Sequence, residues 1–234
     1  MTYASGMAVV NATNKVINEL RARAAKIWDV DVDGVEWEDG HAKPSSSNVG
    51  EFEPLSLAEL AAKANATGGP IGTSEALSAG GQAPGFSPCF CDVEVAPDTG
   101  KVTILRFVLA QDAGTAIHKG YVEGQMQGGV VQGIGWALNE EYIYDDEGRL
   151  SNAGFLDYRI PVASDLPNIE TIVVEVPNPN HPFGVKGVGE VCICPTMAAV
   201  ANAIADATGR RMDSLPMSPP KVLEALDHRE GGEL

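Results

Sequence analysis

Five glycines interrupt a stretch, residues 121–142, whose pattern is otherwise that of a long helix. They are Gly124, Gly128, Gly129, Gly133 and Gly135. Each lowers the stability of a helix by up to ~1 kcal/mol relative to alanine. A helix with this cost is expected where another backbone or a ligand approaches closely. Burial against neighbouring elements explains the glycines equally well, so the stretch predicts close packing without identifying the neighbour.

Strand signals flank this helix on both sides. Residues 90–95 and 102–110 are two strand candidates, and Pro97-Asp98-Thr99-Gly100 between them is a turn signal, so the two runs predict a hairpin. Residues 169–176 are rich in Ile and Val and predict a third strand. Pro195 suits the first position of a further helix that ends near Thr208. These elements predict the α+β class, with mixed sheets and several helices.

The amino-terminal part carries more helix signals than strand signals. Apolar side chains recur at helical spacing over residues 8–28. Ser56 with Glu59 matches a capping box that begins a short helix. A strand candidate at residues 35–37 is expected to pair near Ala42.

Residues 68–88 hold many small residues and no clear period. Such a stretch is a linker or, more often, a functional or interfacial segment. We therefore treat 1–234 as one region, with an expected subdivision into a helix-rich part, 1–88, and a sheet-bearing part, 89–234.

The net charge argues against nucleic acid as a partner. The chain of 234 residues has a formal charge of −16, and its 16 Lys and Arg residues are scattered, whereas binding to a phosphate backbone needs clustered Lys and Arg. No run approaches ~18 consecutive apolar residues, so no membrane span is expected. The first ten residues lack the features of a secretory signal.

Four cysteines fall as two Cys-x-Cys pairs, Cys89 with Cys91 and Cys192 with Cys194. In a strand both members of a pair would share one face, where the geometry for a disulfide between them is poor. We expect four reduced, mostly buried thiols, which favour the cytoplasm. A four-thiolate zinc site is the alternative, although structural zinc sites usually have roughly two to four residues between paired ligands.

Residues 184–190, the glycine loop, read Gly-Val-Lys-Gly-Val-Gly-Glu. Glycines at this density let backbone N–H groups turn toward a ligand, and the first N–H groups of the helix that follows favour an anion. The loop fits neither a Walker motif nor a dinucleotide fingerprint. Its residues alone predict a tight loop that ends in a carboxylate, and a structural turn with a solvated Glu190 remains the alternative.

The glycine loop and two runs after it, 198–204 and 215–219, resemble the end of the molybdenum-binding subunit in the family of xanthine dehydrogenase, aldehyde oxidase and carbon monoxide dehydrogenase. Residues 120–135 are similar to that family's cofactor-contacting helix, and residues 112–118 resemble the loop before it. The preceding hairpin and the amino-terminal helix with its acidic turn are similar as well. The resemblance therefore covers nearly the whole chain.

The resemblance implies a domain of the molybdenum hydroxylase type that binds molybdenum–molybdopterin, with the cytosine dinucleotide form left open and no metal ligand from the protein. Glu190 is then the general base in the oxidation of an N-heterocycle or an aldehyde with oxygen from water. The residues implied at the cofactor are Gln125, Gln132, His118, Lys186, Gly187, Val188 and Gly189.

The family's large subunit is much longer than this chain, and its amino-terminal part, with a Gly-Gln-Gly segment beside the metal, has no counterpart here. The resemblance therefore implies a partner chain that carries this half of the site. It also implies an iron–sulfur subunit, a flavin subunit that holds FAD, and a small-molecule substrate. Two alternatives stay open: a non-catalytic assembly or cofactor-scaffold protein with the same fold, and a truncated product that binds no cofactor.

Overall fold

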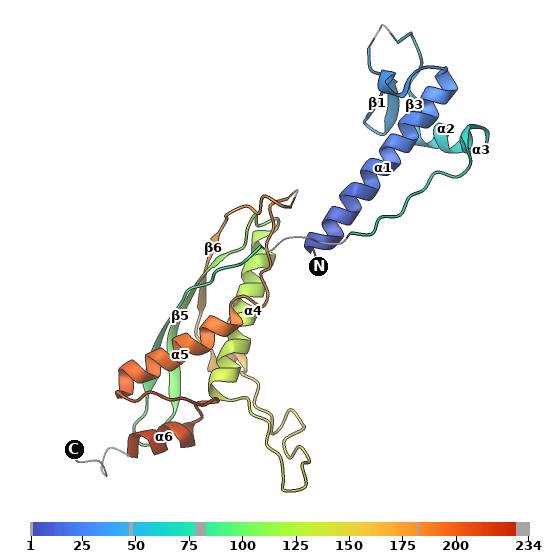
Figure 1. The fold of residues 1–234 in the computed structure, drawn as a ribbon. Helices are drawn as coiled ribbons and strands as arrows, with labels where there is room; N and C mark the ends of the chain where they lie inside the picture. Colours follow the sequence, from blue (N-terminus) through green and yellow to red (C-terminus); the bar gives the residue numbers. More distant parts are fainter. Residues whose placement is uncertain (1, 47–48, 78–82, 182, 228–234) are drawn as a thin grey trace. The chain divides into compact units, whose positions relative to one another are not determined.

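A computed structural model describes residues 2–46, 49–77, 83–181 and 183–227. The chain divides into two compact units, Met1–Gly80 and Gly81–Leu234, and each is described by itself (Figure 1). The division falls inside residues 68–88, the segment of small residues that the sequence marks as a linker or an interface.

The first unit packs one long helix, α1 (Thr2–Trp28), against a small antiparallel sheet. The helix begins earlier than residue 8, because Ala4 and Met7 are good helix formers. A 3-10 turn, η1 (Val32–Gly34), leads into the sheet, whose strands are β1 (Val35–Glu38), β2 (His41–Pro44) and β3 (Leu55–Ser56). Trp37 lies opposite Ala42, which confirms the predicted pairing.

Two short helices, α2 (Leu57–Ala62) and α3 (Ala64–Thr67), complete the first unit. The predicted capping box is confirmed: the N–H of Ser56 donates to Glu59 Oε2 at 2.8 Å, and the N–H of Glu59 donates to the Ser56 hydroxyl at 3.3 Å. The buried core of the unit consists of Leu20, Ala24, Ala25, Val35, Ala42, Leu55 and Leu60.

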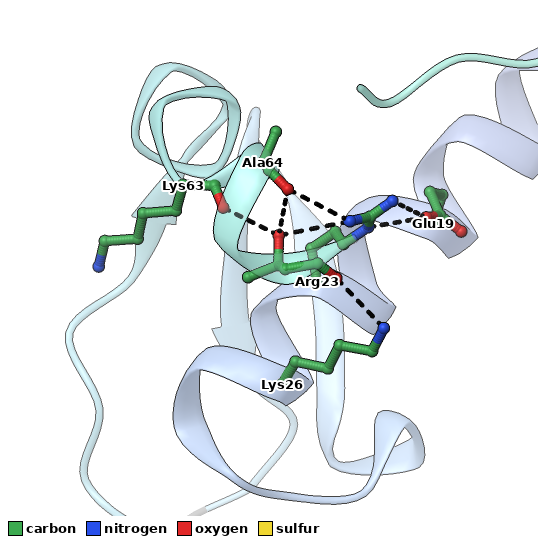
Figure 2. A network of polar contacts seen from close by, with 6 residues as sticks. Glu19, Arg23, Lys26, Lys63 and Ala64 are labelled. Atoms are coloured by element: carbon green, nitrogen blue, oxygen red, sulfur yellow. Dashed lines mark hydrogen bonds and ion pairs between the residues drawn. The ribbon is translucent and has the colours of Figure 1, made fainter. Parts of the chain in front are cut away.

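Arg23 ties α3 to α1 (Figure 2). Its guanidinium pairs with Glu19, one turn earlier in α1, at 2.6 Å. Nη1 also donates to the carbonyl of Ala64 and to the hydroxyl of Thr67, both at 3.5 Å, and Lys26 Nζ donates to the Thr67 carbonyl at 3.2 Å. Cationic side chains of α1 therefore bond to backbone carbonyls of α3.

Gly68 ends α3 with a φ of 141°, and a Cβ at this position would overlap the Arg23 guanidinium. We expect Gly68→Ala to lower the free energy of unfolding by about 1 to 2 kcal/mol, because alanine is strained at this φ and displaces Arg23 from its partners. Gly72→Ala, where an added Cβ meets nothing within 4 Å, should be nearly neutral in the same urea-unfolding measurement. Equal midpoints for the two variants would contradict this interpretation of Gly68.

The second unit is a mixed three-stranded sheet with two long helices, α4 and α5, packed against it (Figure 1). Its elements are β4 (Cys89–Val95), β5 (Val102–Asp112), α4 (Lys119–Leu138), η2 (Ala163–Asp165), β6 (Ile169–Val174), α5 (Ile193–Thr208) and α6 (Pro219–Asp227). β4 and β5 form the predicted antiparallel hairpin, and β6 joins β5 in parallel. The α+β class with mixed sheets is therefore confirmed.

Two helix boundaries differ from the prediction. α4 ends at Leu138 rather than near residue 142, because the N–H of Glu140 turns back to the carbonyl of Gly135 at 2.8 Å. α5 begins at Ile193, so Pro195 is its third residue rather than its first. Proline is tolerated there because N–H groups in the first turn have no helical acceptor. None of the described helices is long and apolar enough to span a bilayer.

All four cysteines are free thiols. Cys89 and Cys91 share the inner face of β4, as predicted, and burial raises their pKa values to about 11 and about 12, so both stay protonated near neutral pH. Cys192 is buried at the start of α5, whereas Cys194 is exposed. The expectation of burial fails for Cys194 because residues two apart on a helix face different directions.

Candidate functional site

The glycine loop leads into α5 and is held against the chain that follows β5. Gly114 and Val185 form an antiparallel bridge, and the N–H of Thr115 donates to the Gly184 carbonyl at 2.8 Å. Gly114 has a φ of 63°, and a Cβ there would overlap the Gly184 carbonyl. Only glycine at position 114 lets the two segments lie this close.

Asp112 and Lys186 fix the loop through a nearly buried ion pair. Lys186 Nζ donates to Asp112 Oδ2 at 2.6 Å, and the two side chains are 11% and 12% exposed. Asp112 Oδ1 accepts the N–H groups of Gly114 and Val176 at 3.0 and 3.3 Å. Burial opposes ionisation of Asp112, but Lys186 and the two amides outweigh it and hold the pKa of Asp112 below its usual value. The backbone N–H of Lys186 donates to the Ala113 carbonyl. The side-chain ammonium and the backbone amide of Lys186 therefore both have partners within the chain.

Gln111 lies under the loop and faces the helix side of the sheet. Its Nε2 donates to the Val188 carbonyl at 3.0 Å and to the Gly187 carbonyl at 3.5 Å. In a trans peptide, a carbonyl and the N–H of the next residue point in opposite directions. The N–H groups of Val188 and Gly189 therefore point away from Gln111. Within the described residues, neither they nor the N–H of Gly187 have an acceptor.

α4 packs closely against the end of the loop. A Cβ at Gly129 would overlap Cys192 Sγ and approach the Gly189 carbonyl to 2.8 Å. A Cβ at Gly133 would lie 2.6 Å from Thr196 Cβ, in the first turn of α5. These two glycines are therefore required for close packing of α4 against α5 and the loop.

A second strip of α4 is open. Gly124 and Gly128 have nothing within 4 Å of an added Cβ. Gln125 and Gln132 are exposed and, seven residues apart, lie on the same side of the helix about two turns from each other. Gln125 Oε1 lies 3.0 Å from the place that a Cβ on Gly189 would take, so the side chain of Gln125 reaches the glycine loop.

The neighbouring residues Gly128 and Gly129 allow one substitution to be compared in two environments. We expect Gly129→Ala to lower the free energy of unfolding by about 2 kcal/mol, because the new Cβ collides with a backbone carbonyl and a buried thiol. Gly128→Ala should raise it by up to ~1 kcal/mol, because alanine favours the helix and meets no neighbour. Urea unfolding of the two variants measures the difference. A loss of stability in Gly128→Ala would contradict the conclusion that Gly128 faces open space.

Glu190 follows the last glycine of the loop, in the turn before α5. Its carbonyl accepts the N–H of Ile193 at 3.3 Å, and the residue is exposed. It is adjacent in sequence to Gly189, where Gln125 meets the loop. The structure thus brings Gln125, the outward amides and Glu190 together, with Gln132 farther along the same helix.

His118 lies at the beginning of α4, where it acts as the N-cap. Its Nδ1 accepts the N–H of Tyr121 at 3.2 Å, and its ring stacks on that of Tyr121 with centroids 4.0 Å apart. Because Nδ1 is an acceptor here, Nε2 carries the proton of the neutral ring. Capping accounts for a histidine at this position.

Sequence analysis missed the contacts that hold the loop, those of Gln111 and of Asp112 with Lys186. The available signal was the glutamine that directly follows the apolar run 107–110, since a buried amide needs hydrogen-bond partners. Among the residues that the structure describes, no group of three His, Cys, Asp or Glu side chains is arranged to hold a metal ion.

Comparison with known proteins identifies the class of the chain. Residues 1–167 match a family model described as a molybdopterin cofactor-binding domain, so most of the chain is a domain of this type. It belongs to the family that contains the molybdenum-binding subunits of xanthine dehydrogenase, aldehyde oxidoreductase and carbon monoxide dehydrogenase. The predicted family is therefore confirmed.

Individual relatives align with most of the chain. The chain is 33% identical to the 6-hydroxypseudooxynicotine dehydrogenase complex subunit gamma of Paenarthrobacter nicotinovorans, over 94% of the chain and 29% of that protein. It is 38% identical to a putative xanthine dehydrogenase molybdenum-binding subunit of Escherichia coli (strain K12), over 74% of the chain and 24% of that protein. Its fold is similar to that of a Cu,Mo-CO dehydrogenase, with a TM-score of 0.76 and 26% identity over 97% of the chain and 29% of the larger one. The chain therefore spans less than a third of the length of these relatives.

Proposed function

We propose that the chain forms the carboxyl-terminal part of the catalytic site in a molybdenum hydroxylase that oxidises an N-heterocycle or an aldehyde with oxygen from water. Glu190 is the general base. The observation that carries the proposal is the glycine loop, whose outward N–H groups are followed directly by the carboxylate of Glu190.

The residues around the loop fit a pterin cofactor. Pterin rings and phosphates are rich in hydrogen-bond acceptors, and backbone N–H groups without an acceptor supply the donors. We assign contacts with the cofactor to the N–H groups of Gly187, Val188 and Gly189 and to the side-chain amides of Gln125 and Gln132. The open glycine positions on α4 leave room for a flat ring beside the helix.

Lys186 and His118 belong to the same site in a different way. The Lys186 ammonium is bound to Asp112, so this residue contributes by holding the loop and its outward amides in place. His118 uses Nδ1 to cap α4, which leaves the N–H at Nε2 of this exposed residue as its donor toward the cofactor.

The molybdenum cofactor, when bound, supplies the two-electron oxidation of the substrate carbon. Glu190 accepts, at its carboxylate, the proton that the attacking oxygen loses. A positioned carboxylate base contributes typically ~10²–10⁴-fold to the rate. The described residues place no cation in an ion pair with Glu190, so its carboxylate oxygens are free to take the proton.

The exposure of Glu190 on this unit is the argument for a partner chain. Proton transfer to a positioned carboxylate proceeds best where bulk water is excluded, and the wall that excludes it must come from other segments. We assign that role to a chain that carries the amino-terminal half of the site. An iron–sulfur subunit and a flavin subunit with FAD carry the electrons away, and the free thiols fit a complex located in the cytoplasm.

The test is metal analysis and turnover of the enzyme assembled around this chain, in its native form and as Glu190→Gln. Molybdenum in the native complex together with a large loss of turnover in the variant supports the proposal. A native complex without molybdenum would instead favour a non-catalytic assembly protein or a product that binds no cofactor.

A further inference from the structure

Gln111 is a fully buried glutamine at the end of β5, with 0% of its surface exposed. A buried amide group is costly unless its donors and acceptor are hydrogen-bonded. Its Nε2 donates to the Gly187 and Val188 carbonyls, so the amide is oriented by two acceptors. Its Oε1 has no partner among the described residues.

A second buried oxygen without a partner among the described residues is the hydroxyl of Ser87, on the segment that pairs with the end of β5. The N–H groups on either side of Gln111, those of Ala110 and Asp112, donate to carbonyls of the segment before β4 at 3.1 and 2.9 Å. The same register, continued two residues beyond the pair of Cys89 and Leu109, places Ser87 across from Gln111 as a non-hydrogen-bonded pair with both side chains on one face. In such pairs the Cβ atoms are typically about 4.5–5.5 Å apart. The Ser87 hydroxyl is also buried without a partner in the described chain.

We infer that Gln111 is the residue that positions the glycine loop for the cofactor, and that a buried water molecule joins its Oε1 to the hydroxyl of Ser87. The part that concerns the cofactor rests on the proposed function. Because Nε2 pulls two successive carbonyls inward, the N–H groups of Val188 and Gly189 are turned outward by the geometry of the trans peptide.

One water molecule satisfies both orphan oxygens. It donates a hydrogen bond to Gln111 Oε1, and it exchanges one with the Ser87 hydroxyl, which is both donor and acceptor. Buried waters typically serve polar groups that the chain itself leaves unsatisfied. An ionised Glu at position 111 cannot replace Gln, since its carboxylate oxygens donate nothing to the two loop carbonyls.

The test of positioning is amide hydrogen exchange in the full chain, followed in the peptide that covers the glycine loop. Gln111→Met keeps the length of the side chain and removes its donors, so the loop amides that are hydrogen-bonded in the native chain, those of Gly184 and Lys186, should exchange about tenfold faster, the factor that corresponds to one buried hydrogen bond. The matched control is Gln127→Met. Gln127 is an exposed residue of α4 that donates to the Ile169 carbonyl at 3.4 Å, and its loss should leave exchange in the loop unchanged.

Unchanged exchange in the loop of Gln111→Met overturns the positioning role. If this variant does not fold, Gln111→Asn takes its place, because it keeps the amide but withdraws Nε2 from the loop by one methylene. The same acceleration is then expected, and native exchange would again overturn the role.

A second variant, Ser87→Ala, tests the buried water through the direction in which it changes hydrogen exchange in the loop. Ser87→Ala removes a hydroxyl, and if that hydroxyl binds a water held by Gln111, exchange in the loop becomes faster. If the hydroxyl has no partner at all, its removal relieves a buried unsatisfied group and leaves the loop unchanged or slower in exchange, which would overturn the water bridge.

Failure of the proposed function would be visible separately. Hydrogen exchange in the free chain reports on the position of the loop without any cofactor. Molybdenum content and turnover of the assembled enzyme report on whether the loop binds the cofactor. A loop loosened by Gln111→Met in an enzyme that keeps both its molybdenum and its turnover would retain Gln111 as a positioning residue and reject the assignment of the loop to the cofactor.

Discussion

Replacement of Glu190 by glutamine is expected to lower turnover of the assembled enzyme at least ~10²-fold, the lower end of the range for loss of a general base. The amide has nearly the shape of the carboxylate but does not take up a proton near neutral pH. Because Glu190 is exposed at the turn before α5, the substitution disturbs no packing in this unit, and the molybdenum content should stay intact.

The control is Glu94→Gln, which makes the same change of charge at an exposed position of β4. It should keep native turnover, so that a loss seen with Glu190→Gln is not an effect of net charge. Unchanged turnover in Glu190→Gln would remove this residue from the mechanism. Loss of molybdenum together with turnover would mean that the carboxylate holds the cofactor in place rather than moving a proton.

The elements that could be predicted are those with local signals. The hairpin of β4 and β5 follows from a turn sequence between two strand candidates, and α2 begins where Ser56 and Glu59 form a capping box. Both signals act over a few residues, so the sequence contains all that decides them.

The glycines of α4 show where local reasoning stops. Glycine is expected in a helix both where another element packs closely against it and where a ligand needs open access to it. In α4 the two explanations apply to different positions. Gly129 and Gly133 are packed against the loop and α5, whereas Gly124 and Gly128 face open space. Which glycine belongs to which group depends on where α5 lies, and spacing along α4 does not contain that information.

The contacts that hold the glycine loop could not be predicted either, because they also depend on how segments distant in sequence pack together. Lys186 and Asp112 are 74 residues apart in sequence, and Gln111 and Val188 are 77 apart. The parallel pairing of β6 with β5 and the bridge between Gly114 and Val185 bring the two segments together. The loop and its carboxylate were recognisable as a motif, but the side chains that orient them were not.

The pair of Lys186 and Asp112 leads to the second large effect, which is on stability. We expect Lys186→Met to lower the free energy of unfolding by ~3 kcal/mol, because the variant leaves a nearly buried carboxylate without its cation. This is the lower end of the range for such pairs, since both side chains keep a little exposure. Lys221→Met is the matched control: its ion pair with Glu141 is 33% and 43% exposed, and its loss should cost less than ~1 kcal/mol.

The pH dependence separates the ion pair from simple loss of packing. The folded chain lowers the pKa of Asp112, so the stability that this carboxylate contributes is present above its unfolded pKa of ~3.9 and is lost as pH falls through the lower folded value. Protonated Asp112 no longer attracts Lys186, and the difference in unfolding free energy between the native chain and Lys186→Met should therefore be greatest near neutral pH and shrink below pH ~4. Urea unfolding at several pH values measures it. A difference that stays constant through this range would show that Lys186 stabilises the loop through its aliphatic stem, and the charge would then have no part in holding the loop.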